Sequence, residues 1–475
     1  MDTESVLQMI PPTGRFLKRG SLLARLELKN WISGRAAILT LWCVVLAGGF
    51  AVYSGAAEID RQRRVIESLP RIEQAQIRRL QNQFPEGTHA GMAAYSHFIH
   101  TVHEPSPWAA LSIGQRDIHP YALKIRLLGL QGQLYDSGIE NPFKLLSGNF
   151  DFVFVIIFLF PLWIIASTYP LVSGEKEEGR WSLLFSQPIS PLYIIGIKLL
   201  VRMGGILLLS TLLFLFALLW TGIGWDAEAL RWWGIFSVYL LFWFGVAFFV
   251  LSFHRSSIFN AVTLAGIWVS WTVLLPALSN LFVTAYFPVP QGVDLTLRQR
   301  EAVNAGWDKT KEETFGRFFK KYPEWSDTAP VTERFAWKWY YAMHQVGDDS
   351  VEALSSAYLH QLKQRQAWAD RLSGFSPPAW VQMRLTRMAG TDLSNHLAYL
   401  ESIKKFHEEL KRFFYPLIFN ERDFKPEDYE KLPAHRFSGP SPPQDASSGM
   451  GILFVGAILL FGLGRHLFLE RCVEK

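Results

Sequence analysis

Cysteine is scarce in this chain, which has two in 475 residues. Cys43 lies inside an apolar run and Cys472 near the C-terminal end of the sequence, so the two long polar segments contain none. An internal disulfide is therefore excluded from those segments, and packing must hold them together.

Charge of one sign is also limited, because a net charge of +5 is small for this length and is spread along the chain. That distribution does not indicate a nucleic-acid partner.

The sequence also lacks the motifs of two enzyme classes. It has no G-x-x-x-x-G-K-[ST], so we do not expect it to bind a nucleoside triphosphate by itself. The H-E-x-x-H of zinc metalloproteases is missing as well. The stretch from His407 to Lys411 begins that motif but has lysine where the second histidine should stand. We therefore expect no catalytic residue and no cofactor in this chain.

Histidines are the remaining candidates for metal ligands. His97, His100 and His103 lie close together in the sequence, and imidazole suits copper or zinc. On a helix the first two would share a face and the third would point away. No cysteine accompanies them, and Pro105 and Pro107 favour a loop with scattered, exposed histidines. The sequence thus predicts no metal site and leaves these three histidines as the candidate for one.

Ionisable residues are nearly absent from the apolar runs. Arg202 and Arg465 stand at the edges of two runs, where a long basic side chain reaches the headgroups at little cost, and Asp151 precedes another run. A carrier coupled to protons or other ions is expected to keep such residues near the middle of the membrane. Their scarcity argues against secondary transport.

Six apolar runs approach the roughly 20 residues that a helix needs to cross a bilayer, and they predict an all-α polytopic membrane protein. The expected spans are 36–56, 152–172, 199–220, 232–253, 258–287 and 449–464. The basic leader 1–35 and the basic tail 465–475 are expected on the cytoplasmic side, by the positive-inside rule. The long polar segments 57–150 and 288–448 then lie outside the membrane on the opposite side.

The two long polar segments are predicted to form one mostly helical, composite domain. Apolar residues recur at near-heptad steps from Ile59 to Leu80, which predicts that the first span continues as a helix bent near Pro70. Weak alternation over 121–135 leaves a short strand pair open. The helices expected in the second segment are 298–321, 332–345, 350–372 and 391–417. Aromatic side chains crowd this segment, and we expect them to pack on the helix after the first span.

The leader ends in a stretch, 15–35, that alternates basic and apolar residues at helical spacing. This pattern predicts an interfacial helix whose apolar face enters the membrane surface, with Arg25, Lys29 and Arg35 reaching for headgroups. Two interpretations remain open. The stretch is either a basic flank that only fixes the topology, or a helix that also contacts a cytoplasmic partner.

The loop 173–198, between the second and third spans, carries a dense group of charges beside the membrane. A cluster of charged residues between 175 and 180 is followed by a short amphipathic segment, 181–186. Pro188 and Pro191 then end that segment, because neither can continue a helix. The candidate functional residues are Glu175, Lys176, Glu177, Glu178, Arg180, Leu183, Leu184, Gln187 and Pro188. Such a compact loop is suited to receiving a push from a soluble partner, and an ordinary polar connector would have the same composition.

This loop resembles the corresponding loop of ABC-2 type transporter permeases, whose pattern is roughly GE(K/R)E-x-G followed by LLxxQPxS. The matching residues are Gly174, Glu175, Lys176, Glu177, Gly179, Leu183, Leu184, Gln187, Pro188 and Ser190. Three further stretches, 110–125, 140–151 and 375–396, are similar to the DUF3526 subgroup, which has large extracytoplasmic inserts. Glu27 and Arg35 match the E-x(7)-R spacing that precedes the first span in this class.

The resemblance implies a six-span permease of the ABC-2, type V exporter-like fold in a bacterial inner membrane, with both termini cytoplasmic. It implies a second permease, identical or a sister chain. It also implies two separate ABC ATPase subunits, which bind ATP and Mg and dock on the loop and the leader helix.

Export is the function that the resemblance implies. Walls rich in Phe, Trp and Leu suit an amphipathic or lipid-like cargo, although a surface that faces lipid has the same composition. The alternative is a non-transporting, ATP-driven mechanical device that acts on an envelope partner through its outer domain.

Overall fold

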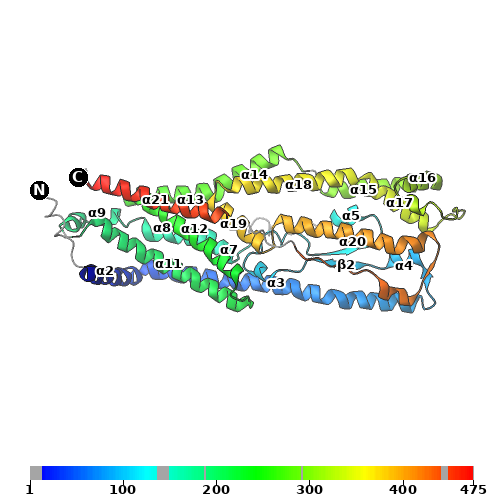
Figure 1. Cartoon of the computed structure of the whole chain (residues 1–475), viewed down its shortest axis with the longest axis horizontal. Helices are drawn as coiled ribbons and strands as arrows, with labels where there is room; N and C mark the ends of the chain where they lie inside the picture. The colour runs from blue at the N-terminus through cyan, green and yellow to red at the C-terminus, as the bar shows by residue number, and fades with distance from the viewer. Residues whose placement is uncertain (1–12, 136–148, 187–188, 290–291, 440–447, 474–475) are drawn as a thin grey trace.

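The computed structural model describes residues 13–135, 149–186, 189–289, 292–439 and 448–473. The fold is nearly all helical and strongly elongated (Figure 1). One end is a bundle of long apolar helices, and the other is a helical domain that contains two short strand pairs. The leader helix α2 (Thr13–Ser33) and the C-terminal end of α21 (Ser448–Val473) lie at the same end of the bundle (Figure 1).

Among the described residues, six helical stretches are long and apolar enough to cross a membrane. They are α3 (Arg35–Gln83), the stretch Phe152–Glu177, α11 (Pro191–Thr221), α12 (Ala227–Leu251), the stretch Ser257–Tyr286, and Gly449–Arg471 within α21. The prediction of an almost all-α chain with six apolar, membrane-length helices is therefore confirmed.

The span boundaries differ most from the prediction at two places. α11 begins at Pro191 rather than at residue 199, because proline fits the first turn of a helix, where its missing N–H would have no partner. α21 continues to Val473, through the part expected to be a tail after residue 464. The loop before α11 is therefore shorter than predicted, and we refer to residues 173–190 as the coupling loop.

α3 connects the bundle to the domain in one piece (Figure 1). Its 49 residues correspond to a length of about 73 Å at 1.5 Å per residue. Pro70 lies inside the helix, where it removes one intrahelical hydrogen bond without ending the helix. The expected continuation of the first span into the polar segment is thus present, and Ile59, Leu69 and Leu80 are buried along it.

Prolines interrupt the second and fifth apolar stretches, and a π turn precedes each of them. η2 (Val155–Leu159) comes before Pro161, and η3 (Ser270–Leu274) comes before Pro276. A proline offers no N–H and crowds the carbonyl one turn earlier, and a wider turn relieves that crowding. Each of these two prolines thus marks a local widening of the α-helix. Pro170 differs, because it follows the end of α8 (Phe160–Thr168) in a turn.

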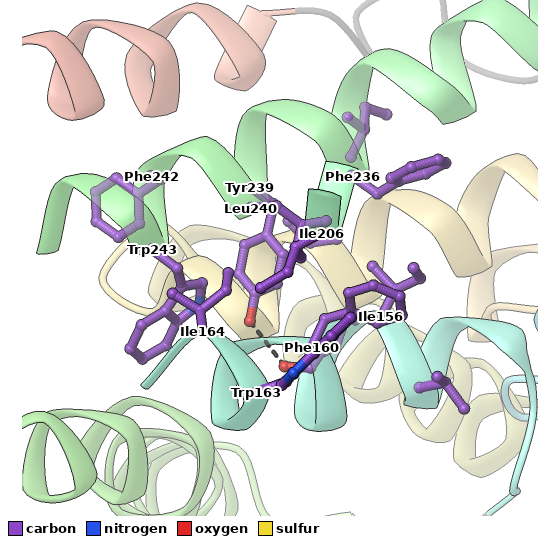
Figure 2. Packing of buried hydrophobic residues seen from close by; sticks show 14 of the residues in the cluster. Ile156, Phe160, Trp163, Ile164, Ile206, Phe236, Tyr239, Leu240, Phe242 and Trp243 are labelled. Atoms are coloured by element: carbon purple, nitrogen blue, oxygen red, sulfur yellow. Dashed lines mark hydrogen bonds between the residues drawn. The ribbon is translucent and has the colours of Figure 1, made fainter. Parts of the chain in front are cut away.

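Hydroxyl groups from other elements satisfy a carbonyl in each π turn. The Tyr239 hydroxyl of α12 donates a 2.8 Å hydrogen bond to the Ile157 carbonyl, four residues before Pro161 (Figure 2). The Ser376 hydroxyl of the polar domain donates a 2.7 Å hydrogen bond to the Trp271 carbonyl, five residues before Pro276. An unpaired carbonyl in hydrocarbon is unfavourable by several kcal/mol. These two bonds therefore hold α12 and the domain against the kinked stretches.

α12 is the most enclosed helix of the bundle. Its aromatic side chains Trp232, Tyr239 and Trp243 are fully buried, and Figure 2 shows Tyr239 above the helix that carries Ile156 and Phe160. A helix that is apolar on all sides must be covered on all sides. Trp232 also stacks on Trp108, which belongs to the first polar segment, with ring centroids 5.1 Å apart. α12 thus anchors both the bundle and the base of the domain.

The polar domain is built from both long polar segments. Its further helices are α4 (Ala90–Ser96), α5 (Leu130–Tyr135), α15 (Gly292–Gly306), α16 (Lys311–Lys321), α17 (Trp337–Ser350), α18 (Glu352–Ser373), α19 (Pro377–Met388) and α20 (Leu393–Phe419). Strand β1 (Thr88–His89) pairs antiparallel with β4 (Asp423–Phe424) across the two segments. Strand β2 (Ile99–Val102) pairs antiparallel with β3 (Ala122–Ile125) within the first segment.

One aromatic core contains residues of both segments. Leu80 and Ile99 of the first segment share it with Phe318 and Tyr341 of the second. The Tyr341 hydroxyl also donates a 3.0 Å hydrogen bond to the Gly91 carbonyl. The crowded aromatic side chains of the second segment therefore find their partner surface in the first.

Secondary structure in the domain differs from the prediction in three places. The single helix expected over 298–321 is two helices, because Thr310 caps a new one by accepting a hydrogen bond from the Glu313 N–H. The sequence analysis does not predict α19, which Ser376 caps. The strand β3 lies within 121–135, where a strand pair was left open, but it pairs with residues 99–102 instead.

The hydrogen bond to the Ile157 carbonyl can be tested by removing one oxygen atom. Tyr239→Phe leaves that carbonyl without its partner and should destabilise the bundle by about 1–3 kcal/mol. Tyr53→Phe is the matched control, since Tyr53 lies in an apolar span and is largely exposed. Thermal unfolding of the full chain in detergent measures both. Equal melting temperatures for the two variants would contradict the role assigned to Tyr239.

The contact between the two polar segments can be tested at Gly91. A Cβ atom there would lie 2.3 Å from the Cβ of Trp337, so Gly91→Ala should overpack the contact of α4 with α17 and destabilise the domain by about 1–3 kcal/mol. Gly316→Ala, in α16, meets no atom within 4 Å and should stabilise the domain slightly. Limited proteolysis and thermal unfolding of the full chain compare them. A Gly91→Ala domain as resistant as the Gly316→Ala domain would show that the segments do not pack as described.

Candidate functional site

The coupling loop folds into two short helices at the end of the bundle. α9 (Ser173–Glu177) forms the last part of the second apolar stretch, and α10 (Trp181–Phe185) precedes α11. Gly179 stands between them with a φ of +72°, a left-handed conformation that glycine adopts without strain. This turn separates the charged helix α9 from the amphipathic helix α10.

Glu175 is the buried centre of the loop. Its carboxylate accepts a 2.5 Å hydrogen bond from the Lys198 ammonium of α11 and a 2.8 Å hydrogen bond from the Arg180 guanidinium. Two cations on one buried carboxylate make strong, charge-assisted bonds. The loop is therefore fixed to the first part of α11.

Glu27 of the leader helix is a second buried carboxylate. It pairs with the Arg202 guanidinium of α11 and lies 4.0 Å from the Lys198 ammonium, so Lys198 stands between both carboxylates. Arg202 also donates a 2.9 Å hydrogen bond to the Ser167 carbonyl of α8. One cation thus holds α2, α8 and α11 together.

The position of Arg202 corrects an expectation. It was predicted to extend to the headgroups from the edge of an apolar run, and instead its guanidinium is largely buried against Glu27. Burying an arginine alone would be unfavourable, and the carboxylate of Glu27 neutralises the charge inside the bundle.

Glu177 links the loop to the fifth apolar stretch. Its carboxylate accepts 2.8 Å hydrogen bonds from both the backbone N–H and the hydroxyl of Ser257, at the start of α13 (Ser257–Val269). A negative charge at the N-terminus of a helix is favourable because of the helix dipole. The hydroxyls of Ser173 and Ser257 lie 2.7 Å apart and strengthen the same joint.

These contacts at the end of the bundle are what we call the ion-pair relay: Glu27, Arg202, Lys198, Glu175 and Arg180 form one connected set, and Glu177 with Ser257 adds a separate joint on the same loop. The relay joins the leader helix, the coupling loop and three apolar stretches. A displacement of the loop must therefore strain or carry all of them.

The predicted loop residues divide into an inner and an outer set. Glu175 and Glu177 belong to the relay, and Lys176 reaches back to the His254 carbonyl at 3.4 Å. Glu178 pairs with Arg180 at the surface, and the Leu183 side chain on α10 is 64% exposed. Leu184 lies in α10 as well. Gln187 and Pro188 fall outside the described residues.

The predicted leader residues also divide. Glu27 is in the relay, whereas Arg25, Lys29 and Arg35 are exposed. Sequence reasoning missed Lys198 and Arg202 as partners. The sequence does contain an indication of this pairing. Two basic residues four positions apart on an apolar helix lie on one face, and their burial there requires a neighbouring carboxylate.

The histidines are arranged differently from the prediction of scattered, exposed side chains. His97 and His100 lie 3.7 and 4.0 Å from the carboxylate of Glu73, on α3, and burial lowers the pKa of His97 to about 4. His103 lies apart, stacked on Tyr399. The prediction of exposure was wrong because residues 99–102 form strand β2 inside the domain. Within the described ranges no three His, Cys, Asp or Glu side chains are placed to hold a metal ion.

Comparison with known proteins identifies the second polar segment only. Residues 294–438 match the family model described as "Domain of unknown function (DUF3526)". No curated protein and no solved structure gives a significant match. The matched region begins within α15 and ends after α20 and β4, in the polar domain. The six apolar stretches and the ion-pair relay lie outside it.

The relay can be tested with a charge-pair cycle. Glu27→Ala leaves the buried Arg202 without its carboxylate and should destabilise the bundle by about 3–5 kcal/mol. The double variant Glu27→Leu/Arg202→Met removes both charges and should recover most of that loss. As a control, Arg231→Ala breaks a more exposed pair with Glu228 and should change stability by about 0–1 kcal/mol. Unfolding of the full chain in detergent gives all three values, and a double variant that is as unstable as Glu27→Ala, or less stable, would exclude the pair.

Proposed function

We propose that this chain is the membrane-spanning permease subunit of an ATP-driven ABC transporter of the ABC-2 type. The observation that carries the proposal is the ion-pair relay between the coupling loop, the leader helix and three apolar stretches. A loop that serves only as a connector does not need a buried carboxylate such as Glu175, whose desolvation is unfavourable unless its partners are fixed. A loop that transmits force does need rigid joints.

The partner that would supply the force is a separate ABC ATPase, in two copies, which binds ATP and Mg. It would dock on the outer face of the coupling loop, where Leu183, Glu178 and Arg180 are exposed. An exposed leucine surrounded by charges is typical of an apolar anchor inside a polar rim. The ion-pair relay lies directly beneath this face. The surface that would bind the ATPase and the contacts that would transmit its movement therefore belong to the same short loop.

A second permease, identical or a sister chain, completes the proposed unit. In support, the stretch Ser257–Tyr286 is almost entirely unburied along its apolar length. Such a surface faces lipid or another membrane helix. Six spans place both termini on one side, which we assign to the cytoplasm of a bacterium, with the polar domain outside the inner membrane.

The cargo that suits this architecture is an amphipathic or lipid-like small molecule, moved outward. The bundle walls are apolar and no ionisable side chain lies in the middle of α11, α12 or α21. A small ion would find no ligand there. An amphiphile needs only an apolar path and polar groups at its ends.

A mechanical device is the second candidate, and α3 favours it. This helix runs without interruption from the leader break into the domain core. A movement at the membrane would therefore displace the far domain, which could act on an envelope partner without any cargo. ATP-dependent flux of a fluorescent lipid in vesicles that carry the complex separates the two candidates: flux supports transport, and hydrolysis without flux supports the mechanical role.

The docking face is tested by Leu183→Arg. Placing a charge at the anchor should weaken association with the ATPase at least tenfold, which corresponds to about 1.4 kcal/mol. Leu297→Arg, at an equally exposed leucine of α15, is the control and should leave association unchanged. Affinity purification of the full chain from its native membrane, followed by ATPase assay, measures both. If no P-loop ATPase accompanies the unmodified chain, the proposal fails.

A further inference from the structure

An apolar cleft lies where the leader helix meets the bundle. Its volume is about 330 Å³, and its walls come from α2, α3, α8 and α11. Leu28, Ile32, Ala37, Trp163, Leu208 and Leu212 are among the lining residues, and all members of the lining are apolar or glycine. The volume falls in the range of sites that hold small molecules, roughly 300–1,000 Å³.

Three local features create this space. Gly34 breaks the chain between α2 and α3 with extended backbone angles, so the two helices diverge from that point. Trp31 stacks on Trp163 with ring centroids 6.1 Å apart and closes the inner side. Gly205 allows this, because a Cβ atom there would lie 2.6 Å from the Trp31 ring. The cavity is thus a wedge with an aromatic floor.

The other side of the wedge is open to the membrane. Ile32 is 49% exposed, and Leu208 and Leu212 of α11 are 59% and 53% exposed. These residues belong to a helix of membrane length and to the interfacial leader. A lipid chain could enter from the side without crossing any polar surface.

Exposed basic side chains flank the wedge on its α2 side. Arg25 and Lys29 are exposed on α2, and each lies one helical turn from a lining residue, Leu28 or Ile32. Arg202, in contrast, is engaged by Glu27 behind Trp31. Two available cations beside an apolar slot match an amphiphile with a negatively charged head.

We propose that this wedge binds one acyl chain of an anionic phospholipid from the surrounding bilayer, with Arg25 and Lys29 holding its phosphate. The proposal depends on the chain lying in a membrane and not on transport or on an ATPase. The bound lipid would fill the space between the leader helix and α11, next to the Glu27–Arg202 pair. It would thereby stiffen the joint through which the relay reaches α2.

The apolar part of the site is tested by filling it. Ala37→Phe places a ring in the wedge, whereas Ala36→Phe adds the same ring at the neighbouring exposed position, which does not line it. Native mass spectrometry of the delipidated full chain, titrated with phosphatidylglycerol, should show at least tenfold weaker binding for Ala37→Phe and no change for Ala36→Phe. Leu208→Phe fills the wedge from α11 and decides the test if Ala37→Phe does not fold. Unchanged phosphatidylglycerol binding by a folded filled variant would overturn the site.

The charged part is tested by comparing lipid heads. Arg25→Gln/Lys29→Gln should lose at least fivefold of the preference for phosphatidylglycerol over phosphatidylcholine, and Lys309→Gln/Lys320→Gln, in the polar domain, should keep it. The proposal fails if the unmodified chain shows no such preference. It also fails if Ala37→Phe abolishes a dimer and not a lipid adduct, since the wedge would then hold a second copy of the chain.

Discussion

Two buried carboxylates on different segments share the cations of one helix face, and the bundle end depends on this arrangement. Glu27 and Glu175 are 148 positions apart, yet Lys198 lies between them and Arg202 completes the set. Each charge would be strongly unfavourable alone in an apolar bundle, so Glu27 and Arg202 in particular depend on one another. The leader helix and the coupling loop therefore have one position relative to α11.

A second constraint, the need to pair every carbonyl in an apolar environment, positions the domain. Proline interrupts two membrane-length stretches, and each interruption is satisfied from outside its own helix. Tyr239 serves one from inside the bundle. Ser376 serves the other from the polar domain while it also caps α19. The base of the domain is thus held by the same requirement that shapes the spans.

Composition and periodicity predicted the six apolar helices and the extension of α3, because hydrophobic length is a local property. The start of α20 is also local, because Thr391 and Asp392 are both suitable N-caps by residue type, and the Asp392 carboxylate is the one that accepts from the Asn395 N–H. Composition and periodicity did not predict the partners of the charged residues. Glu27 meets Arg202 only through the packing of α2 on α11, and no local pattern encodes that meeting. The histidines were misjudged for the same reason, since the strand that buries them pairs across a loop. Two helix starts, in contrast, are visible in the local sequence. Thr310 followed by Glu313 is typical of the start of α16, and Ser376 followed by Pro377 of the start of α19.

The proposed force path follows from how these constraints are connected in sequence. The relay holds α2 at Glu27, and α2 leads through Gly34 directly into α3. Gly34 has extended backbone angles and separates the two helices, so a change in the angle between α2 and α3 would be centred there. Beyond Gly34 the helix has no further break before the domain core. A push on the coupling loop would thus be turned at one glycine and then delivered over the whole length of α3, so that the spans and the outer domain would move in a single step, whether the load is a cargo or an envelope partner.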